Sequence, residues 1–352
     1  YFNMIVIVGA GLSGLLVGYR LKQLNVPFQI IEARERIGGR IHTVLSANAT
    51  PVEMGATWFG NQHLHLKKLL SELGISHFEQ FMSGITFYQP SSNAPVSAIS
   101  IPDQQPSYRL QGGTSQLIQK LAERVGEENI ILNATVSQIE FYDDQALVHA
   151  DSVYKASRVV LALPPKLWAS NIKISPSTPG DLLKTALSTH TWMEESIKVA
   201  LVYETPFWRN NNHSGVLFSN GGPITEFYDH SNFDENKYAL CGFVHPNFAK
   251  LAFEERKAKI ADQLANVFGR EARDFQDYME SIWEEQDHTY SRSLGQLIPH
   301  QNNGNPIYRK SYFKDRLFIS SSETAELYPG YMEGAVVSAS FTVDSLKLSK
   351  AY

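Results

Sequence analysis

The chain has 352 residues, of which 43% are hydrophobic, and a formal net charge of −5. This length suits two domains, and the absence of a basic surplus argues against nucleic acid as a partner. No apolar run approaches the ~20 residues that span a bilayer, so the sequence also predicts no membrane partner.

The first predicted element is a strand over residues 4–8. This run is short, apolar and rich in β-branched residues, which is typical of a strand buried on both faces. A turn with three glycines follows, and then a helix over residues 12–24. In such a turn the first glycine permits a tight bend, the second lets the backbone approach a pyrophosphate, and the third lets the helix pack against the strand. The free N–H groups and the dipole at the helix start attract phosphate.

A second strand over residues 28–31 ends in Glu32. A carboxylate roughly 20 residues past the glycines can accept hydrogen bonds from a ribose hydroxyl, and it would repel a 2′-phosphate. The order of strand, glycines, helix, strand and acid therefore predicts a dinucleotide site that is unsuited to NADP. The alternative, an ordinary βαβ unit with a glycine turn, leaves the glycines and the acid unexplained.

Further along, residues 89–106 are rich in Pro, Ser, Asn and Gln, a composition that favours loop or edge structure. Hydrophobic spacing predicts helices over 113–125 and 251–268, and strands over 130–140, 146–149 and 159–163.

Another predicted strand, 196–203, places Lys198 on a face with Ala200 and Val202. Since that face is largely apolar, a buried lysine with a lowered pKa is one interpretation. A structural lysine that extends its amine to solvent is the other.

The run Glu32-Ala33-Arg34-Glu35-Arg36-Ile37-Gly38-Gly39-Arg40 resembles the FAD-binding start of the flavin amine oxidase family, which includes monoamine and polyamine oxidases. The family's motifs continue in order through nearly the whole chain, at Gly55-Ala56-Thr57-Trp58-Phe59-Gly60, Arg109-Leu110-Gln111-Gly112-Gly113, Lys198-Val199, Pro206-Phe207-Trp208-Arg209, and from Glu323 to Ala335.

The resemblance implies an α/β fold. An FAD-binding Rossmann-like (GR2-type) domain, similar to NAD(P)-binding domains, would be joined to a smaller α+β substrate domain built on a mixed sheet. The FAD-binding domain would be discontinuous, with residues 1–80, 107–180 and 285–352. Residues 81–106 and 181–284 would form the substrate domain. The first of these insertions is short for the family, which implies a more open substrate cavity.

The resemblance also assigns roles to individual residues. Arg40 would lie beside the pyrophosphate or ribityl chain, where its planar fork suits phosphate oxygens. The backbone of Val136 would meet the adenine, although a core strand valine is an equally good interpretation. Glu323 would hold the ribityl or diphosphate region, and Met332 would offer its backbone N–H to the flavin pyrimidine edge. The cofactor-binding residues expected in all are Gly9, Gly11, Leu12, Ser13, Gly14, Glu32, Ala33, Arg34, Gly39, Arg40, Gly55, Ala56, Thr57, Trp58, Val136, Glu323 and Met332.

Two residues are the expected catalytic ones, and no metal site is expected. By the resemblance, Lys198 would hold a water against flavin N5, and Tyr331 would form one wall of an aromatic cage for the amine. In monoamine oxidases of this family, a cysteine bonds the flavin covalently and a tyrosine follows it. By the resemblance, the corresponding segment here is 284–295, which has no cysteine, so FAD should be bound non-covalently. The only aromatic residues of this segment are His288 and Tyr290, which leaves the second cage wall in doubt and weakens the preference for amines.

The leading hypothesis is an FAD-dependent amine oxidase that transfers hydride from an amine α-carbon to flavin N5 and is reoxidised by oxygen to give peroxide. One alternative is a flavin-dependent desaturase or oxidase of a non-amine substrate, of the protoporphyrinogen or carotenoid type. Another is a non-catalytic flavin-binding scaffold, which the unusual Ser321-Ser322 pair before Glu323, usually Gly-Thr in the family, would suit. The partners expected are a small amine and oxygen, and the oligomeric state stays open.

The sequence also bears on the compartment. It contains a single cysteine, Cys241, and no secretory signal pattern. One cysteine excludes an internal disulfide and fits a reducing compartment, so we expect a cytoplasmic protein.

Overall fold

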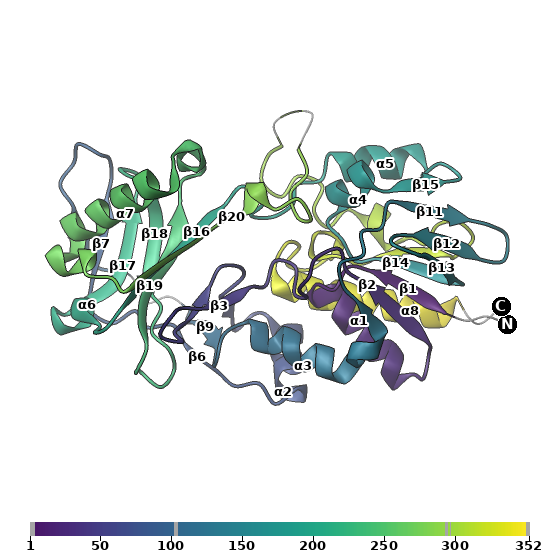
Figure 1. The fold of residues 1–352 in the computed structure, drawn as a ribbon, viewed down its shortest axis with the longest axis horizontal. Helices are drawn as coiled ribbons and strands as arrows, with labels where there is room; N and C mark the ends of the chain where they lie inside the picture. The colour runs from purple at the N-terminus through teal and green to yellow at the C-terminus, as the bar shows by residue number, and fades with distance from the viewer. Residues whose placement is uncertain (1–3, 102–104, 293–294, 296, 350–352) are drawn as a thin grey trace.

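The computed structural model describes residues 4–101, 105–292, 295 and 297–349. It consists of two lobes, each built around one large sheet, with smaller sheets and helices beside and between them (Figure 1). Within these ranges, every helix is too short or too polar to cross a membrane.

The first lobe is built on a five-stranded sheet in which every pairing is parallel. Its strands, in spatial order, are β10 (Ile130–Ile131), β2 (Phe28–Ile31), β1 (Ile5–Val8), β14 (Arg158–Leu161) and β21 (Leu317–Ile319). The sheet therefore joins the earliest strand of the chain, at its centre, to the last strand, at its edge.

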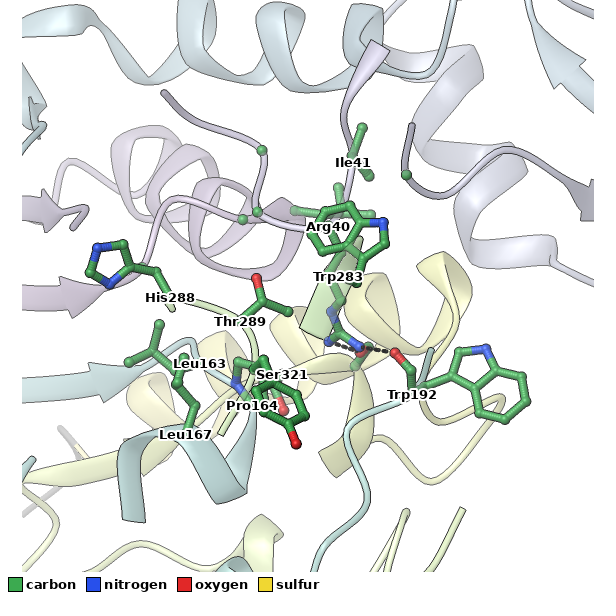
Figure 2. Close-up of a pocket in the computed structure, with 18 of the residues that line it drawn as sticks. Arg40, Ile41, Leu163, Pro164, Leu167, Trp192, Trp283, His288, Thr289 and Ser321 are labelled. Atoms are coloured by element: carbon green, nitrogen blue, oxygen red, sulfur yellow. Dashed lines mark hydrogen bonds between the residues drawn. The ribbon is translucent and has the colours of Figure 1, made fainter. Parts of the chain in front are cut away.

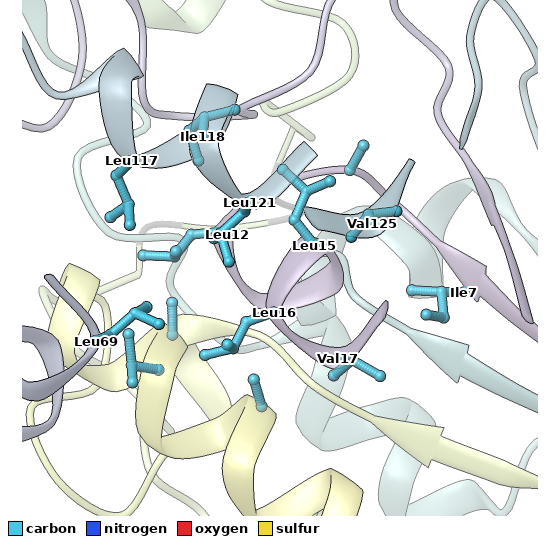
Figure 3. Packing of buried hydrophobic residues seen from close by; sticks show 14 of the residues in the cluster. Ile7, Leu12, Leu15, Leu16, Val17, Leu69, Leu117, Ile118, Leu121 and Val125 are labelled. Carbon is cyan, nitrogen blue, oxygen red and sulfur yellow. The ribbon is translucent and has the colours of Figure 1, made fainter. Parts of the chain in front are cut away.

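Strand β1 alternates its side chains between two cores, as a strand buried on both faces must. Ile5 and Ile7 pack with helices α1 (Leu12–Gln23), α2 (Leu64–Glu72), α3 (Ser115–Val125) and α8 (Met332–Leu348), as Figure 3 shows for part of this cluster. Val6 and Val8 pack on the opposite face, with helices α4 (Pro165–Asn171) and α5 (Gly180–Leu187) and a four-stranded sheet. The strands of that sheet are β13 (Val153–Ala156), β12 (Ala146–His149), β11 (Gln138–Phe141) and β15 (Lys173–Ser175).

The second lobe is built on a seven-stranded mixed sheet, in which only β17 and β7 pair in parallel. Its strands, in spatial order, are β20 (Asp277–Ile282), β16 (Ile197–Tyr203), β19 (Tyr238–Val244), β18 (Ile224–Asp229), β17 (His213–Ser219), β7 (Ile85–Gln89) and β8 (Ser97–Ile99). Helix α7 (Phe253–Phe268) covers one face of this sheet (Figure 1).

Shorter elements join the two lobes. They are β3 (Thr43–Leu45) paired with β4 (Pro51–Glu53), and the sheet of β5 (Phe59–Gly60), β9 (Ser107–Leu110) and β6 (His77–Glu79). The short helix α6 (Phe207–Asn210) belongs to the second lobe, where Phe207 and Trp208 pack into the core of the mixed sheet. The parallel sheet under helices and the separate mixed sheet confirm the predicted fold class.

Two predicted elements were wrong in detail. The strand predicted over 130–140 is two strands, β10 and β11, which belong to different sheets, and the chain between them crosses from one sheet to the other. The strand predicted over 159–163 is β14, which ends earlier, at Leu161, and Pro165 begins helix α4, where a proline suits the first turn.

The segment 89–106 was predicted as loop or edge structure, and it contributes β8 at the edge of the mixed sheet.

The domain boundaries stay a prediction. Strands β7 and β8 fall within the proposed segment 81–106, and β16 to β20 fall within 181–284. Helix α5, which the boundary assigns largely to the substrate domain, packs through Leu182 and Ala186 into the core beside the parallel sheet.

Candidate active site

One cavity of about 910 Å³ draws its lining from both lobes, and this volume is within the range of ligand sites. Most of the residues proposed from the sequence line it: Gly9, Gly11, Leu12, Ser13, Glu32, Ala33, Arg34, Gly39, Arg40, Gly55, Ala56, Thr57, Trp58, Val136, Lys198, Tyr331 and Met332. Gly14 and Glu323 are not part of the lining.

The first and last motifs of the chain meet at this cavity. Ser13 Oγ lies 2.6 Å from Ser320 Oγ and donates to the Ser320 carbonyl at 3.0 Å, although 307 positions separate the two residues. Ser321 and Ser322, next to that contact, line the cavity together with Gly11. A single ligand can therefore touch both motifs.

Two helix N-termini border the cavity. Helix α1 begins after Gly11 and helix α8 after Tyr331, and neither has a side-chain hydrogen bond that caps its start. The first N–H groups of a helix have no partner within the helix, and the dipole is positive there. A Cβ added at Gly11 would meet nothing within 4 Å, so the space at this helix start is open to an anion.

Gly14 acts from behind the cavity. A Cβ at this position would lie 2.0 Å from the Gly9 carbonyl oxygen, which no side chain tolerates. Its role is therefore to let helix α1 pack tightly against the glycine turn.

Glu32 and Arg34 fix one end of the cavity. The Glu32 carboxylate accepts hydrogen bonds from the backbone N–H of Ala10 at 2.8 Å and of Arg34 at 2.9 Å. Because a carboxylate has about four lone-pair sites, capacity remains for ligand hydroxyls. The Arg34 guanidinium donates to Thr289 Oγ1 at 2.6 Å and to the His288 carbonyl at 3.3 Å, which holds segment 287–292 against this end. Figure 2 shows the side chains of His288 and Thr289.

Arg40 and Glu323 form a buried ion pair under the cavity. The Nη1 and Nη2 atoms of Arg40 bind the two carboxylate oxygens at 2.6 and 3.0 Å. They also donate to Ser322 Oγ and to the Trp192 carbonyl, and Figure 2 shows Arg40 beside Trp192. Burial would raise the pKa of Glu323, but the charge and hydrogen bonds of Arg40 outweigh it and lower that pKa. Both Nη atoms already have protein acceptors, so a phosphate can use only Nε unless it displaces one of them.

Lys198 lies at the other end, on the face of β16 opposite α7. It is 1% exposed, so its amine does not reach solvent as the alternative interpretation would need. The Nζ atom donates to the Gly55 carbonyl at 2.6 Å and to Thr57 Oγ1, and it lies 4.7 Å from the Trp58 ring centroid. Burial lowers the pKa of Lys198, and the negative charge of the buried Glu53 opposes that shift.

Tyr331 is 40% exposed and has aromatic neighbours that the sequence did not indicate. The Trp192 ring lies 5.7 Å from its ring, and the His300 ring 6.1 Å. Trp192 and His288 both line the cavity, but His288, a candidate for the second wall, lies at the Arg34 end. Tyr290, the other candidate, also lines the cavity. Residues 293 and 294 of the same segment lie outside the described residues.

Sequence reasoning also missed Trp283, which lines the cavity and donates from Nε1 to the Met54 carbonyl at 2.9 Å. A single tryptophan without a surrounding motif is typical of a core residue. No pattern in the sequence separated Trp192 or Trp283 from that interpretation.

Comparisons with known proteins bear on the family and the fold. The family model of flavin containing amine oxidoreductases matches residues 12–92 and 100–345. A probable flavin-containing monoamine oxidase A of Dictyostelium discoideum is 26% identical and covers 95% of each chain, and the human flavin-containing amine oxidase B is 23% identical and covers 94% of this chain and 84% of its own. The first of these alignments extends over 441 positions, more than the 352 residues present here, so that relative carries internal segments that this chain lacks.

Solved structures show the same fold. A putrescine oxidase bound to putrescine has a TM-score of 0.86 at 24% identity, and it covers 98% of this chain and 99% of its own. A cyclohexylamine oxidase from Brevibacterium oxydans has the same TM-score and coverage at 18% identity.

Proposed function

The chain belongs to the flavin-containing amine oxidoreductase family, and on this premise we propose how its residues divide the work of an FAD-dependent amine oxidase. The lining residues fit FAD. An open helix N-terminus at Gly11 suits a pyrophosphate, the Glu32 carboxylate suits a ribose, and the uncapped start of α8 suits an electron-rich ring edge.

The cofactor would be held without a covalent link to cysteine. Cys241 is the only cysteine in the sequence, its thiol donates to the Glu53 carbonyl, and it is absent from the cavity lining. Met332 would donate its backbone N–H to the pyrimidine edge. When bound, FAD supplies the redox chemistry: it accepts a hydride equivalent from the amine α-carbon and delivers the electrons to oxygen.

Lys198 would bind a water molecule beside the reacting atoms, and its amine would donate or accept a proton there. The contacts of its Nζ atom with Gly55 and Thr57 support this role, because that segment is expected to pass close to the reactive ring. Because burial lowers its pKa, Nζ gives up a proton more readily than an exposed lysine does.

Tyr331 would place the substrate amine, with Trp192 as the neighbouring ring. Aromatic faces attract cationic groups and exclude water from the reacting carbon. The partial exposure of Tyr331 suits a position at the entrance of the site.

The observation that carries the proposal is the meeting, in one cavity, of two uncapped helix N-termini and a fully buried lysine. The test is anaerobic mixing of the FAD-loaded protein with a panel of amines. We expect the flavin absorbance to bleach with some amines and to return with oxygen, with peroxide formed. Bleaching by a porphyrinogen or a polyene, and by no amine, would contradict the proposal.

We also keep the cytoplasmic location as a proposal. It is supported by the single cysteine of the chain, Cys241, which is buried as a free thiol. Cell fractionation with an antibody to the protein tests it, and recovery in a secreted fraction would contradict it.

A further inference from the structure

Three cavity-lining side chains stand in one row across the mixed sheet. Lys198 on β16 pairs with Phe243 on β19, and Phe243 pairs with Glu226 on β18. Directly opposed residues of antiparallel strands share a face, and neighbouring strands lie about 4.8 Å apart. We call Lys198, Phe243 and Glu226 the cavity row. Its two charged ends are therefore separated by two strand spacings, roughly 10 Å at the backbone.

Glu226 brings a negative charge into this row that the proposed chemistry does not use. Within the described part of the chain, its carboxylate accepts one hydrogen bond, from the Tyr228 phenol at 2.9 Å, and forms no ion pair. The residue is half-buried. A carboxylate is an acceptor only, so a half-buried one is stabilised when a cationic donor comes to it.

The space between the two ends of the row is bordered by aromatic rings. The Phe243 side chain stands between Lys198 and Glu226 in the row, and the Trp58 ring lies 6.2 Å from it. Trp58 also lies 4.9 Å from Tyr228, the residue that holds Glu226. Such walls suit a chain of methylene groups better than a polar linker.

We propose that Glu226 is a specificity-determining residue that binds a second, protonated amine of the substrate, so that the preferred substrates are short aliphatic diamines. This inference rests on the proposed function, since it concerns the same cavity. The reacting amine lies at the Lys198 end, the methylene chain lies along Phe243 and Trp58, and the distal ammonium donates to the carboxylate of Glu226. An ω-amino acid of the same length is disfavoured, because its distal carboxylate would face the carboxylate of Glu226.

The test compares pairs of substrates with equal carbon chains. Putrescine and cadaverine are measured against n-butylamine and n-pentylamine, which lack the second ammonium, and the readout is the ratio of kcat/KM within each pair. We expect the wild-type ratio to favour the diamine and to fall roughly 10- to 100-fold in Glu226→Gln, the loss expected for one hydrogen bond between charged groups. Glu204→Gln removes an equal charge from an exposed residue that does not line the cavity, and it should leave the ratio unchanged.

A second readout is independent of turnover, because it uses protein whose bound flavin has first been reduced with dithionite and cannot oxidise an amine. Under anaerobic conditions, putrescine should raise the Tm of this reduced, FAD-loaded protein more than n-butylamine does, and Glu226→Gln should abolish the difference. If the glutamine variant does not fold, Glu226→Asp retains the charge on a shorter side chain and should shift the preference from putrescine toward cadaverine.

The outcomes separate the two proposals. Equal kcat/KM values for putrescine and n-butylamine in the wild type, or an unchanged ratio in Glu226→Gln, overturn the role of Glu226 and leave amine oxidation standing. Equal losses on both substrates make Glu226 a counter-charge for Lys198 and likewise overturn it. Reduction of the flavin by no amine at all overturns the proposed function itself.

Discussion

At the scale of single residues, Lys198 combines near-complete burial with two polar contacts to the segment at Gly55 and Thr57. A buried amine that only filled space would be replaceable by methionine without effect on chemistry. One that orients water or carries a proton would not.

We therefore predict that Lys198→Met retains FAD and slows the reduction of the flavin by amine, its reoxidation by oxygen, or both, by about 10²- to 10⁴-fold. Stability should also fall, by about 1–3 kcal/mol, because the Gly55 carbonyl and the Thr57 hydroxyl lose a buried hydrogen-bond donor. Stopped-flow absorbance measures both half-reactions. Lys173→Met, at an exposed lysine of β15, is the control. Normal rates in both half-reactions would remove Lys198 from the chemistry.

At the scale of elements, the contact of α1 with the glycine turn depends on the absence of one methyl group. At Gly14 that methyl group would come within 2.0 Å of a carbonyl oxygen, so either the helix or the turn must move. The turn and the helix start both line the cavity, and a shift of either alters the phosphate-facing N–H groups.

Gly14→Ala should therefore weaken FAD binding at least tenfold and lower the free energy of unfolding by about 1–3 kcal/mol, the cost of overpacking a tight contact. Gly180→Ala is the matched control, because a Cβ there meets nothing within 4 Å and the residue begins α5. Fluorescence titration with FAD and urea unfolding measure the two effects. Equal FAD affinity in both variants would show that the close contact is not needed.

The elements with a repeating pattern were predictable from the sequence. Strand β1, helix α1 and strand β16 lie where they were predicted. The composition of β1 is apolar and β-branched, and α1 and β16 each have a clear hydrophobic spacing. The break between β10 and β11 was not predictable, because the chain changes sheets there without an obvious glycine or proline signal. Trp192 and Glu226 were not predicted as site residues for a related reason. Their proposed roles depend on neighbours from distant segments, which the local sequence does not reveal.

At the scale of the whole molecule, the Arg40–Glu323 pair ties an early segment to a late one, and it also holds the backbone of Trp192 from both sides. Glu323 is fully buried, so its charge depends on this partner. Since its folded-state pKa is lowered, the pair stabilises the fold above the unfolded-state pKa of about 4.3, and that stabilisation is lost as the pH falls through the lower folded-state value.

Glu323→Gln should lower the free energy of unfolding at neutral pH by about 3 kcal/mol, because it leaves a largely buried arginine without its charge partner. Below about pH 4.3, the wild type should lose stability on acidification more steeply than the variant, so that the two converge. Urea unfolding followed across this pH range measures both quantities. Parallel pH profiles would mean that Glu323 is not the group that titrates.

The contact between Ser13 and Ser320 has a consequence for how the protein matures. The ribosome makes the glycine turn first, yet the wall opposite it is encoded 307 positions later. During synthesis, the phosphate-facing edge of β1 and α1 stays exposed to water until β21, the last strand of the parallel sheet, has been made. Cofactor loading is therefore expected to be a late event that closes the fold, and flavin supply to govern how much newly made chain reaches its native state.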